Sequence, residues 1–248
     1  MAPHHSSEEA FLKAYDPSAY ERPSTSIDCV IYTVMDNALQ VLLVKRAEHP
    51  AKGQWSLVGG YVDLANDADL EGAAKRKLHE KTSVKTPYLE QVCTIGNNAR
   101  DPRGWSVTTV YFALLPADAV TLKTGPGTED IQWAKVSNGH VAMPLAFDHA
   151  LLLKRATQRL HNKVLYTSLP IYLMPKQFTL GELQQVYEII LQHPIDGKSF
   201  RRRVLCADFL EATDQFKRET KRPARIYRKT RNAPPHAFQR NIEGIRQE

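Results

Sequence analysis

The segment richest in possible chemistry is GGYVDLANDADLEGAAKRKLHEKTSV, which begins at Gly59. Its glycines allow the backbone to approach a ligand closely, and its acidic loop leads into a helix expected over residues 69–82. Lys77, Glu80 and Lys81 are spaced i, i+3 and i+4, so they share one face of that helix. Two ammonium groups beside one carboxylate repel a divalent cation, but they can bind phosphate directly as point charges. The spacing therefore predicts phosphate binding without metal-dependent chemistry, although a plain loop and surface helix is the alternative.

Strands and helices alternate around this segment, as they do in domains built on a mixed sheet. The run SIDCVIYTVMDNALQVLLVKRAE predicts two strands joined by a turn at Asp36-Asn37, and VLLVKR is apolar enough to be buried on both faces. Further strands are expected in YLEQVCTIGN, WSVTTVYFALL and IQWAKV. The run FDHALLLKRATQRLHNK predicts a helix whose buried side comprises Phe147, Ala150, Leu151, Leu153 and Leu160. We expect one α/β domain within residues 1–165.

A different kind of sequence follows. The run YTSLPIYLMPKQ has two prolines and no helical period, so a linker is expected at about residues 165–177. Thr179 and Glu182 have the spacing of a capping box, at the start of a helix that Pro194 ends. A second helix is expected in FRRRVLCADFLEA, and two short strands around a basic tip in QFKRETKRPARIYRK. Helix, turn, helix and hairpin is the order of a winged helix-turn-helix domain, which we place at residues 166–248.

The charge of the chain differs between these two parts. Residues 1–150 contain 14 basic and 18 acidic residues, whereas residues 151–248 contain 19 basic and 9 acidic ones. The overall net charge of +6 thus combines −4 in the first part with +10 in the second. Such asymmetry suggests a polyanionic partner for the basic part. The alternative is a basic surface that is only solvated.

The second helix of the basic part has the pattern of a DNA-recognition helix. At about 100° per residue, Phe200, Val204 and Ala207 fall on one side and form a core face. Cations on the opposite arc and on the hairpin can bond to guanine edges and phosphates, so we expect duplex DNA as the partner. The alternative is an amphipathic helix with an ordinary charged outer face. The predicted DNA-binding residues are Lys198, Ser199, Arg201, Arg202, Arg203, Lys221, Arg222 and Arg225.

Composition excludes several classes of protein. A hydrophobic content of 42% with 24% charged residues is that of a globular chain. The first residues lack the pattern of a secretory signal, and no run approaches the roughly 18 apolar residues of a membrane span. Cys29, Cys93 and Cys206 are scattered and form no CxxC pair, which argues against a zinc site or a disulfide framework. A cytoplasmic location is expected, because a reducing compartment suits free cysteines.

The phosphate-binding segment resembles the Nudix box: a glycine, five residues, Glu, seven residues and REUxEExGU, where U is a bulky aliphatic residue. In that motif, glutamates on one helix face hold the Mg²⁺ that polarises a pyrophosphate. Here the run RKLHEKTSV, residues 76–84, has lysine at two metal-ligand positions and serine in place of the glycine. The preceding loop is two residues longer than the pattern, which leaves Ala68 at the usual acidic position. Metal-dependent hydrolysis is therefore expected to be absent or feeble.

Over residues 12–242 the chain resembles the Nudix-related transcriptional regulators of NAD metabolism. The resemblance is carried by VLLVKR with Trp55, GGYVD, RKLHEKT, CTIGNNARDPRGWSVT, MPLAFDH and GKSFRRRV. It implies an α/β, Nudix-like mixed-sheet sandwich domain followed by a C-terminal winged helix-turn-helix domain. It further implies a homodimeric repressor of genes for NAD synthesis or salvage, whose binding to a double-stranded DNA operator responds to ADP-ribose or a related nucleotide. Members reading RKLxEKT are expected to bind this effector without cleaving it, so no catalytic residue, metal or cofactor is expected.

The resemblance and the chemistry of the residues together indicate the ligand contacts. Arginines can bond phosphate or ribose groups, and a loop at residues 98–105 could stack on or cover a nucleotide. The predicted ligand-binding residues are Arg46, Gly60, Arg76, Lys77, Glu80, Lys81, Asn98, Arg100, Trp105, Phe147 and Asp148. His149 follows in the same run, either at the rim of the pocket or as a capping or core histidine.

Three functions remain open at this point. The favoured one is a repressor whose ligand binds the DNA-free arrangement of the dimer more tightly, with the angle of the winged domains as the lever. The second is an active Mg²⁺-dependent hydrolase of ADP-ribose-like substrates, in which Glu80 with Asp67 or Asp69 holds the metal and the basic domain is accessory. The third is a nucleic-acid binder without sequence preference, which would bind unrelated duplexes alike and with a steep salt dependence.

Overall fold

The computed structural model describes residues 7–85, 88–218, 223–231 and 234–242. Its α-helices are α1 (Glu8–Ala14), α2 (Leu70–Thr82), α3 (His149–Val164), α4 (Leu180–Leu191) and α5 (Gly197–Leu205). Its 3-10 helices are η1 (Pro17–Ala19), η2 (Ala117–Ala119) and η3 (Leu169–Leu173). Its strands are β1 (Ser24–Met35), β2 (Ala38–Arg46), β3 (Trp55–Ser56), β4 (Val58–Tyr61), β5 (Tyr88–Asn97), β6 (Ser106–Leu114), β7 (Thr128–Lys135), β8 (Phe178–Thr179), β9 (Leu210–Lys217) and β10 (Ala224–Lys229).

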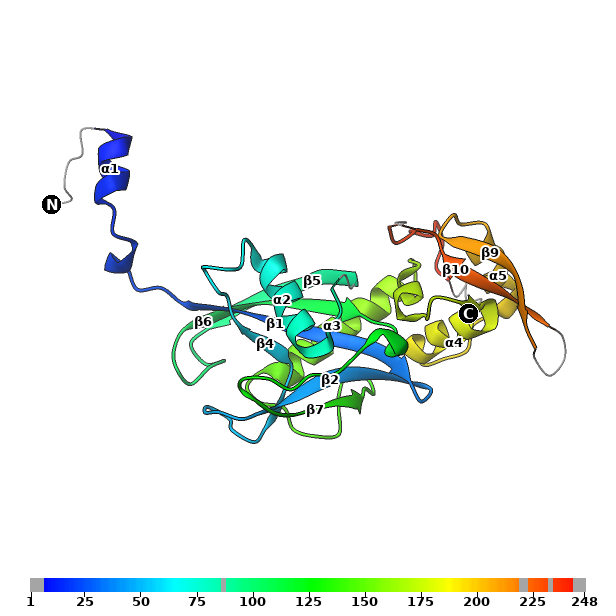
Figure 1. Ribbon diagram of the computed structural model, residues 1–248, viewed down its shortest axis with the longest axis horizontal. Coiled ribbons are helices and arrows are strands. Elements are labelled where there is room, and N and C mark those ends of the chain that lie inside the picture. Colours follow the sequence, from blue (N-terminus) through cyan, green and yellow to red (C-terminus); the bar gives the residue numbers. More distant parts are fainter. Residues whose placement is uncertain (1–6, 86–87, 219–222, 232–233, 243–248) are drawn as a thin grey trace, which may run out of the picture.

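Strands β1 to β7 form one mixed sheet in the larger domain (Figure 1). The strand order is β3-β2-β1-β6-β5, with β4 also paired to β1 and β7 to β2. β1 and β6 run parallel, whereas β1 pairs with β2 and β4, and β2 with β7, in antiparallel fashion. The predicted turn between β1 and β2 is confirmed, because Asp36 and Asn37 have φ values of 51° and 57°, which such tight hairpins need.

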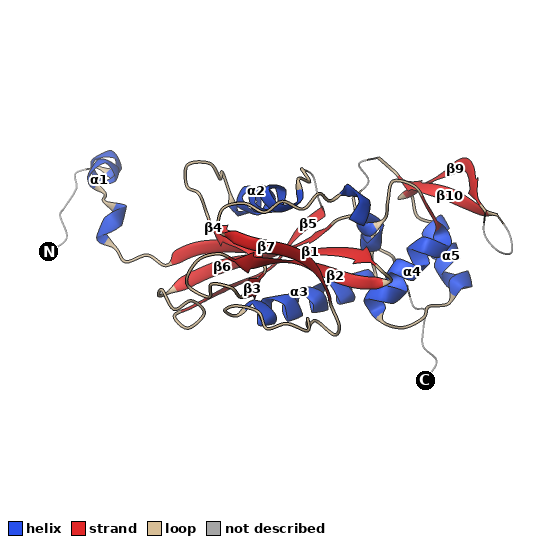
Figure 2. Ribbon diagram, turned by 60° about the horizontal axis from the view of Figure 1, so that its bottom comes forward, coloured by secondary structure: helices blue, strands red, loops and turns tan. Residues whose placement is uncertain are grey.

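The sheet is covered on both faces, by α2 on one side and α3 on the other (Figure 2). Since side chains alternate along a strand, Cys29 and Ile31 of β1 enter the core beneath α2, and Val30 and Tyr32 enter the core on the α3 side. Seven consecutive residues of β2 are buried. The two-sided burial expected from VLLVKR is therefore confirmed.

Both ends of α2 are capped. The helix begins after Asp69, whose Oδ1 accepts a hydrogen bond from the Gly72 N–H at 2.6 Å. It ends at Thr82 and is capped by Ser83, which has a φ of 61° and donates its N–H to the His79 carbonyl at 2.9 Å. Ser83 stands where the Nudix box has glycine, so a left-handed cap that favours glycine is here formed by a serine.

Helix α3 buries a different set of residues from the one expected. Leu153 and Leu160 are buried as predicted, but Ala150 and Leu151 are exposed. Leu151 lies about 200° around the helix from Leu153 and therefore faces solvent. The buried stripe is formed by His149, Leu152, Leu153, Ala156, Leu160 and Val164.

The second domain contains α4 and α5 and a three-stranded sheet with the order β8-β10-β9. The capping box is confirmed: the Glu182 N–H donates to Thr179 Oγ1 at 3.2 Å, and the Thr179 N–H donates to Glu182 Oε2 at 2.7 Å. Helix α5 ends at Leu205, so the expectation that it runs on to residue 212 was wrong. Residues from Leu210 onward are strand, because they pair with β10.

The expected linker at residues 165–177 is not a linker. Leu169, Ile171 and Leu173 of η3 are buried in a core that includes side chains of α3 and α4. The hydroxyl of Tyr187 in α4 donates to the carbonyl of Thr167 at 2.8 Å. The prolines of this segment permit a 3-10 turn rather than a flexible connection, and packing is continuous across the domain division that we place at residue 165.

Helix α1 stands apart from the sheet, at one end of the molecule (Figure 1). None of its residues is buried. The ring of Tyr15 contacts those of Phe11 and Tyr20, at centroid distances of 5.5 and 6.1 Å. Throughout the described ranges, no helix combines the length and apolar character needed to cross a membrane.

Candidate functional site

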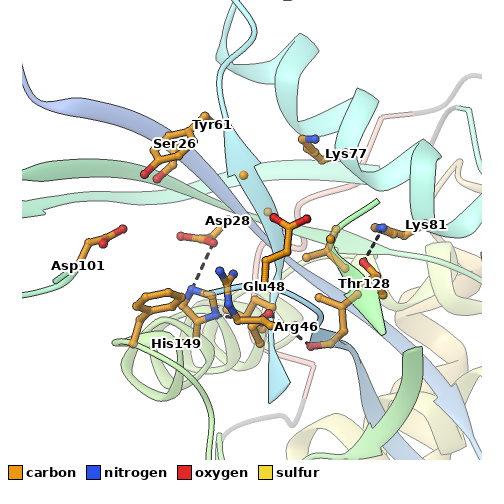
Figure 3. Close-up of a pocket in the computed structure, with 18 of the residues that line it drawn as sticks. Ser26, Asp28, Arg46, Glu48, Tyr61, Lys77, Lys81, Asp101, Thr128 and His149 are labelled. Atoms are coloured by element: carbon orange, nitrogen blue, oxygen red, sulfur yellow. Dashed lines mark hydrogen bonds and ion pairs between the residues drawn. The ribbon is translucent and has the colours of Figure 1, made fainter. Parts of the chain in front are cut away.

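A pocket of about 340 Å³ opens beside the cationic face of α2. Its walls come from α2, β4, the end of β2, the loop after β5 and the start of α3 (Figure 3). Of the ligand-binding residues predicted from the sequence, it contains Arg46, Gly60, Lys77, Glu80, Lys81, Arg100 and Phe147.

The α2 wall carries two ammonium groups and one carboxylate. Lys77 Nζ lies 3.2 Å from Glu80 Oε2, so this pair is partly neutralised. Lys81 is only 9% exposed, and its Nζ donates to Thr128 Oγ1 at 2.7 Å. Burial lowers the pKa of Lys81, and the neighbouring charge of Lys77 lowers it further against the opposing effect of Glu80. The pocket therefore holds a desolvated cation whose described partner is a neutral hydroxyl.

Glycine at position 60 is required by this arrangement. Gly60 has a φ of 151°, which residues with a side chain rarely adopt. A Cβ added there would lie 3.1 Å from Cε of Lys77. The glycine thus lets the lysine side chain lie close against β4.

Arg76 supports the pocket from outside it. Its guanidinium forms two hydrogen bonds with Asp67, at 2.7 and 2.6 Å, and a third with Glu80 at 3.0 Å. These bonds to Arg76 lower the pKa of Asp67 to about 2. Arg76 was predicted as a ligand contact, but it does not line the described pocket, and its observed contacts tie the acidic loop to α2.

A buried arginine clamp forms the opposite wall. Arg100 is 6% exposed at its side chain, and it donates to both carboxylate oxygens of Asp148 at 3.1 Å. The same guanidinium lies 3.4 Å from Asp28 Oδ2, which also accepts a hydrogen bond from Thr108 at 2.8 Å. Asp148 does not line the pocket and holds Arg100 in place. Two carboxylates and one guanidinium thereby connect β1, the loop before β6 and the start of α3.

His149 is both a core residue and a pocket residue. Its Nδ1 accepts the Leu57 N–H at 3.0 Å, so the ring proton of the neutral form is on Nε2, which faces Asp28 Oδ1 at 3.5 Å. Burial lowers the pKa of His149 despite the nearby carboxylate. The neutral imidazole is therefore the form that the fold favours.

Arg46 and Phe147 form another part of the wall. The guanidinium carbon of Arg46 lies 4.9 Å from the centre of the Phe147 ring, and its Nε donates to the Pro50 carbonyl at 2.9 Å. Burial lowers the pKa of Arg46. Phe147 has a φ of 55°, a left-handed conformation that is unusual for a bulky residue. That backbone turn places the ring beside the pocket just before α3 begins.

Asn98 and Trp105 are not among the residues that line the pocket. Asn98 is exposed, and Trp105 is 53% exposed. The Trp105 ring covers Gly96 so closely that an added Cβ would lie 2.9 Å from its Cη2 atom. Their contact with a bound nucleotide stays a prediction, and in this structure Trp105 packs against its own hairpin.

The exposed face of α5 is basic, as predicted. Asp196 caps the helix by accepting the Ser199 N–H at 2.7 Å, while Phe200 and Val204 are buried beneath it. Lys198, Arg201 and Arg202 are exposed. The neutral inner face and the charged outer face are those of a helix that can enter a DNA groove.

The remaining cations of this domain differ in their surroundings. Arg203 is half-buried, its pKa is lowered by burial, and no described atom bonds its buried Nη1. The hairpin formed by β9 and β10 is called the wing. On the wing, Arg225 Nε donates to the Thr213 carbonyl at 2.9 Å. Lys221 and Arg222, also predicted to contact DNA, lie outside the described residues.

Comparison with known proteins gives the chain a family. Residues 25–156 match the family model of the NUDIX domain, and residues 170–229 match that of the NrtR DNA-binding winged helix domain. The "ADPR responsive transcriptional repressor NtrR" of Acinetobacter baylyi is 49% identical over 223 residues, which cover 90% of this chain and 88% of that protein. The chain belongs to the NrtR family of Nudix-related proteins.

Solved structures of NrtR share this architecture. Shewanella oneidensis NrtR in complex with a 27mer DNA is 44% identical, with a TM-score of 0.80 over 88% of this chain and 98% of that one. The NUDIX domain of the same protein in complex with ADP ribose is also 44% identical, with a TM-score of 0.57 over 62% of this chain and 99% of that one. The predicted fold class, a Nudix domain with a mixed sheet and a C-terminal winged helix domain, is confirmed.

Some pocket residues of this NrtR-family chain were missed in the sequence. Asp28 is the lone charge in β1 and lies among buried residues, and that isolation is a signal that could have revealed it. Arg103 pairs with Asp101 at 2.7 Å and lies over the Tyr61 ring at 5.1 Å. Asp101 and Arg103 lie in the loop before β6 and Tyr61 ends β4, and no spacing in the sequence indicates that this loop and this strand meet.

Proposed function

We propose that this chain is a DNA-binding transcriptional repressor that binds ADP-ribose in its Nudix domain and controls genes of NAD synthesis or salvage. The observation that carries the proposal is the α2 wall of the pocket, where Lys77 and Lys81 flank the single carboxylate of Glu80. The relatives support it, since the Acinetobacter baylyi protein is an ADPR responsive repressor and the Shewanella oneidensis protein has been solved with DNA and, as its NUDIX domain, with ADP ribose.

Binding would rely on fixed cations. The pyrophosphate of ADP-ribose can accept hydrogen bonds from Lys77 and Lys81 on one side and from Arg46 on the other. Gly60 leaves room beside Lys77 for the backbone of β4 to approach the ligand. Because Arg100 is already satisfied by two aspartates, we assign it to the shape of the wall rather than to the ligand's charge.

The same residues do not fit a magnesium ion, so we propose a sensor without metal, cofactor or catalysis. Two of the positions that would supply carboxylates are Lys77 and Lys81. Asp67 is bonded to Arg76 and Asp69 caps α2, so neither of these two candidate ligands is available. Among the described residues, no group of three or more His, Cys, Asp or Glu side chains could hold a metal ion.

Helix α3 offers a route from the pocket to the DNA-binding domain. His149, at its start, lines the pocket, and Leu160 and Val164, near its end, share a core with Leu183 and Tyr187 of α4. A ligand that binds one position of α3 more tightly would favour one arrangement of the winged domains. Coupling of this kind typically changes affinity by about 5- to 150-fold. We propose that ligand binding is transmitted to the DNA-binding domain through this packed helix rather than through a flexible linker.

We further propose a cytoplasmic homodimer that binds an operator with two half-sites. Dimeric winged and helix-turn-helix proteins read half-sites about one helical turn apart, which requires a fixed distance between two recognition helices. A change in the tilt of α4 and α5 in each copy would alter that distance and weaken binding.

The first test is a calorimetric titration of ADP-ribose into the protein with Mg²⁺ present, followed by nucleotide chromatography of the same sample. We expect a saturating isotherm and intact ADP-ribose. Continuous heat and the appearance of AMP would show that the chain is a hydrolase, and no heat would leave the effector unidentified. The double variant Lys77→Glu/Lys81→Glu restores the acidic face and should lose metal-free binding while gaining Mg²⁺-dependent turnover.

The DNA half of the proposal is tested separately. A duplex selected by the protein from a random library serves as the operator in a fluorescence anisotropy titration. A specific repressor should bind it roughly 10³-fold or more tightly than an unrelated duplex at physiological salt. Saturating ADP-ribose should change that affinity, and an unchanged value would refute the coupling through α3.

A further inference from the structure

A second and larger hollow lies between the Nudix domain and the wing. It has a volume of about 820 Å³, and its surroundings are the end of β6 with the following turn, the start of β5, η3 and β10. The cationic pocket beside α2 shares none of its described lining residues. We call it the inter-domain groove. The residues that line it are Val84, Tyr88, Leu114, Leu115, Pro116, Asp118, Ala119, Ile171, Tyr172, Met174, Pro175, Lys176, Arg228 and Lys229.

The floor of the inter-domain groove is apolar and aromatic. Leu115, Ile171 and Met174 are buried side chains that border it. The rings of Tyr88 and Tyr172 lie 4.7 Å apart, centre to centre. The Tyr88 hydroxyl already donates to Glu90 at 2.6 Å. A flat apolar group can therefore pack against these rings without leaving the Tyr88 hydroxyl buried and lacking a hydrogen bond.

The groove also contains a poorly compensated cation. Lys229 Nζ lies 4.2 Å from the centre of the Tyr172 ring, and burial lowers the pKa of this lysine. No described carboxylate forms an ion pair with Lys229, whereas its neighbour Arg228 bonds Glu211 at 2.8 Å. Glu90 is unavailable, because Arg159 and Lys163 already bond it at 3.0 and 2.6 Å.

The charge of the described lining is predominantly positive. Lys176 and Lys229 contribute cations, and the carboxylate of this lining, Asp118, is exposed at the rim. A partly buried ammonium beside an aromatic floor is complementary to a molecule with a flat apolar body and one anionic group. A nucleoside diphosphate is less well suited, since its phosphates and hydroxyls would face aliphatic side chains.

We propose that the inter-domain groove is a second small-molecule site, which binds an aromatic or otherwise flat apolar compound through a single anionic group on Lys229. The site is independent of the ADP-ribose pocket. Since its walls come from both the Nudix domain and β10 of the wing, a bound molecule stabilises one placement of the wing against the sheet. Binding in the groove is thus a second way for a small molecule to change the affinity of the protein for DNA.

The test uses two fluorescent probes that differ in one charge. 8-Anilinonaphthalene-1-sulfonate has a flat apolar body with one anionic group, and N-phenyl-1-naphthylamine is its neutral counterpart. The wild-type protein should bind the anionic probe at one site and about tenfold or more tightly than the neutral one. Lys229→Met should weaken the anionic probe about tenfold and leave the neutral one within twofold. Such a tenfold change corresponds to about 1.4 kcal/mol.

Controls separate this site from others. Lys45→Met removes a cation of β2 that pairs with Glu129 at 2.6 Å and lies outside the groove, so it should leave both probes unaffected. Lys229→Gln provides a second neutral variant, and the melting temperature of each variant reports its folding. Saturating ADP-ribose should not displace the anionic probe.

Three results would overturn the proposal. The first is an anionic probe that binds wild-type protein and both Lys229 variants equally well, or does not bind at millimolar concentration. The second is stoichiometric displacement of that probe by ADP-ribose, which would place it in the other pocket. The third is probe affinity that falls as the protein self-associates in sedimentation runs, which would show that a second copy of the chain covers the groove. None of these results bears on whether ADP-ribose controls DNA binding.

Discussion

Lys81→Met removes one charge from the proposed ADP-ribose pocket with little change in side-chain volume. In the ligand-free protein, Lys81 Nζ donates to Thr128 Oγ1 at 2.7 Å, and the side chain is 9% exposed. A phosphate group that reaches this ammonium would replace a neutral partner with an anionic one. Hydrogen bonds to charged groups contribute about 1.5–3 kcal/mol, so the Kd for ADP-ribose should rise by about 10- to 150-fold.

The matched control is Lys75→Met on the same helix. Lys75 pairs with Glu71 at 2.5 Å in solvent and does not line the pocket. Its substitution should leave the Kd for ADP-ribose within about twofold, because exposed pairs contribute little. Titration calorimetry of the three proteins at the same ionic strength measures the comparison. Equal affinity of Lys81→Met and wild type, or equal weakening by both substitutions, would refute the assignment of Lys81 to the phosphates.

The pH dependence of binding follows from the same lysine. Burial lowers the pKa of Lys81 in the free protein, whereas a bound phosphate would favour its charged form. The affinity for ADP-ribose should therefore fall as the pH rises through this lowered pKa, because binding then requires uptake of a proton. The fall should be smaller in Lys81→Met. Parallel titrations of both proteins between pH 7 and 10 test this, and identical profiles would contradict it.

Three further substitutions test other parts of the structure. Asp148→Ala leaves Arg100 buried with Asp28, at 3.4 Å, as its remaining described carboxylate and with a long hydrogen bond to Ser106. The substitution should lower the free energy of unfolding in urea by about 3 kcal/mol, and no loss would mean that the clamp is not structural. Asp67→Asn should destabilise the protein at neutral pH, because the folded state lowers the pKa of Asp67 from 3.8 to about 2. The difference in melting temperature from wild type should disappear as the pH falls from 3.8 through about 2, which thermal melts can follow. Arg202→Ala should weaken the selected operator by about 1–3 kcal/mol with a smaller effect on unrelated duplexes, whereas uniform weakening in anisotropy titrations would indicate a phosphate contact.

Local features of the fold could be read from the sequence because they depend on neighbouring residues. The β1–β2 turn needs only two residues that tolerate left-handed backbone, and the capping box at Thr179 needs only a partner three residues away. The cationic face of α2 follows from helical spacing alone. These predictions hold because each feature depends on residues that are close together in the sequence.

Features that depend on distant partners were missed. The segment at residues 165–177 looks like a linker until α3 and α4 are placed on either side of it. Trp105 appears suited to stack on a nucleotide, yet Gly96 on the adjacent strand offers it a closer surface. Phe147 was predicted as a ligand contact and does line the pocket, but the φ of 55° that places its ring there is not indicated by composition. The linker was mispredicted because its burial depends on packing between elements that are far apart in sequence.

The core shared by α3, η3 and α4 limits how parts of such chains can be exchanged between relatives. A chimaera joined near residue 165 would pack Leu169, Ile171 and Leu173 against side chains from another protein. Each aliphatic side chain that loses its burial lowers the free energy of unfolding by about 1.5–3 kcal/mol. Functional chimaeras should therefore inherit these three elements from one parent. The inner face of α5 belongs to the same core through Phe200 and Val204, but its basic side chains lie on the outer surface and are free of that constraint. Recognition of new DNA sequences can thus evolve on α5 while the inner helices that would carry the signal stay unchanged.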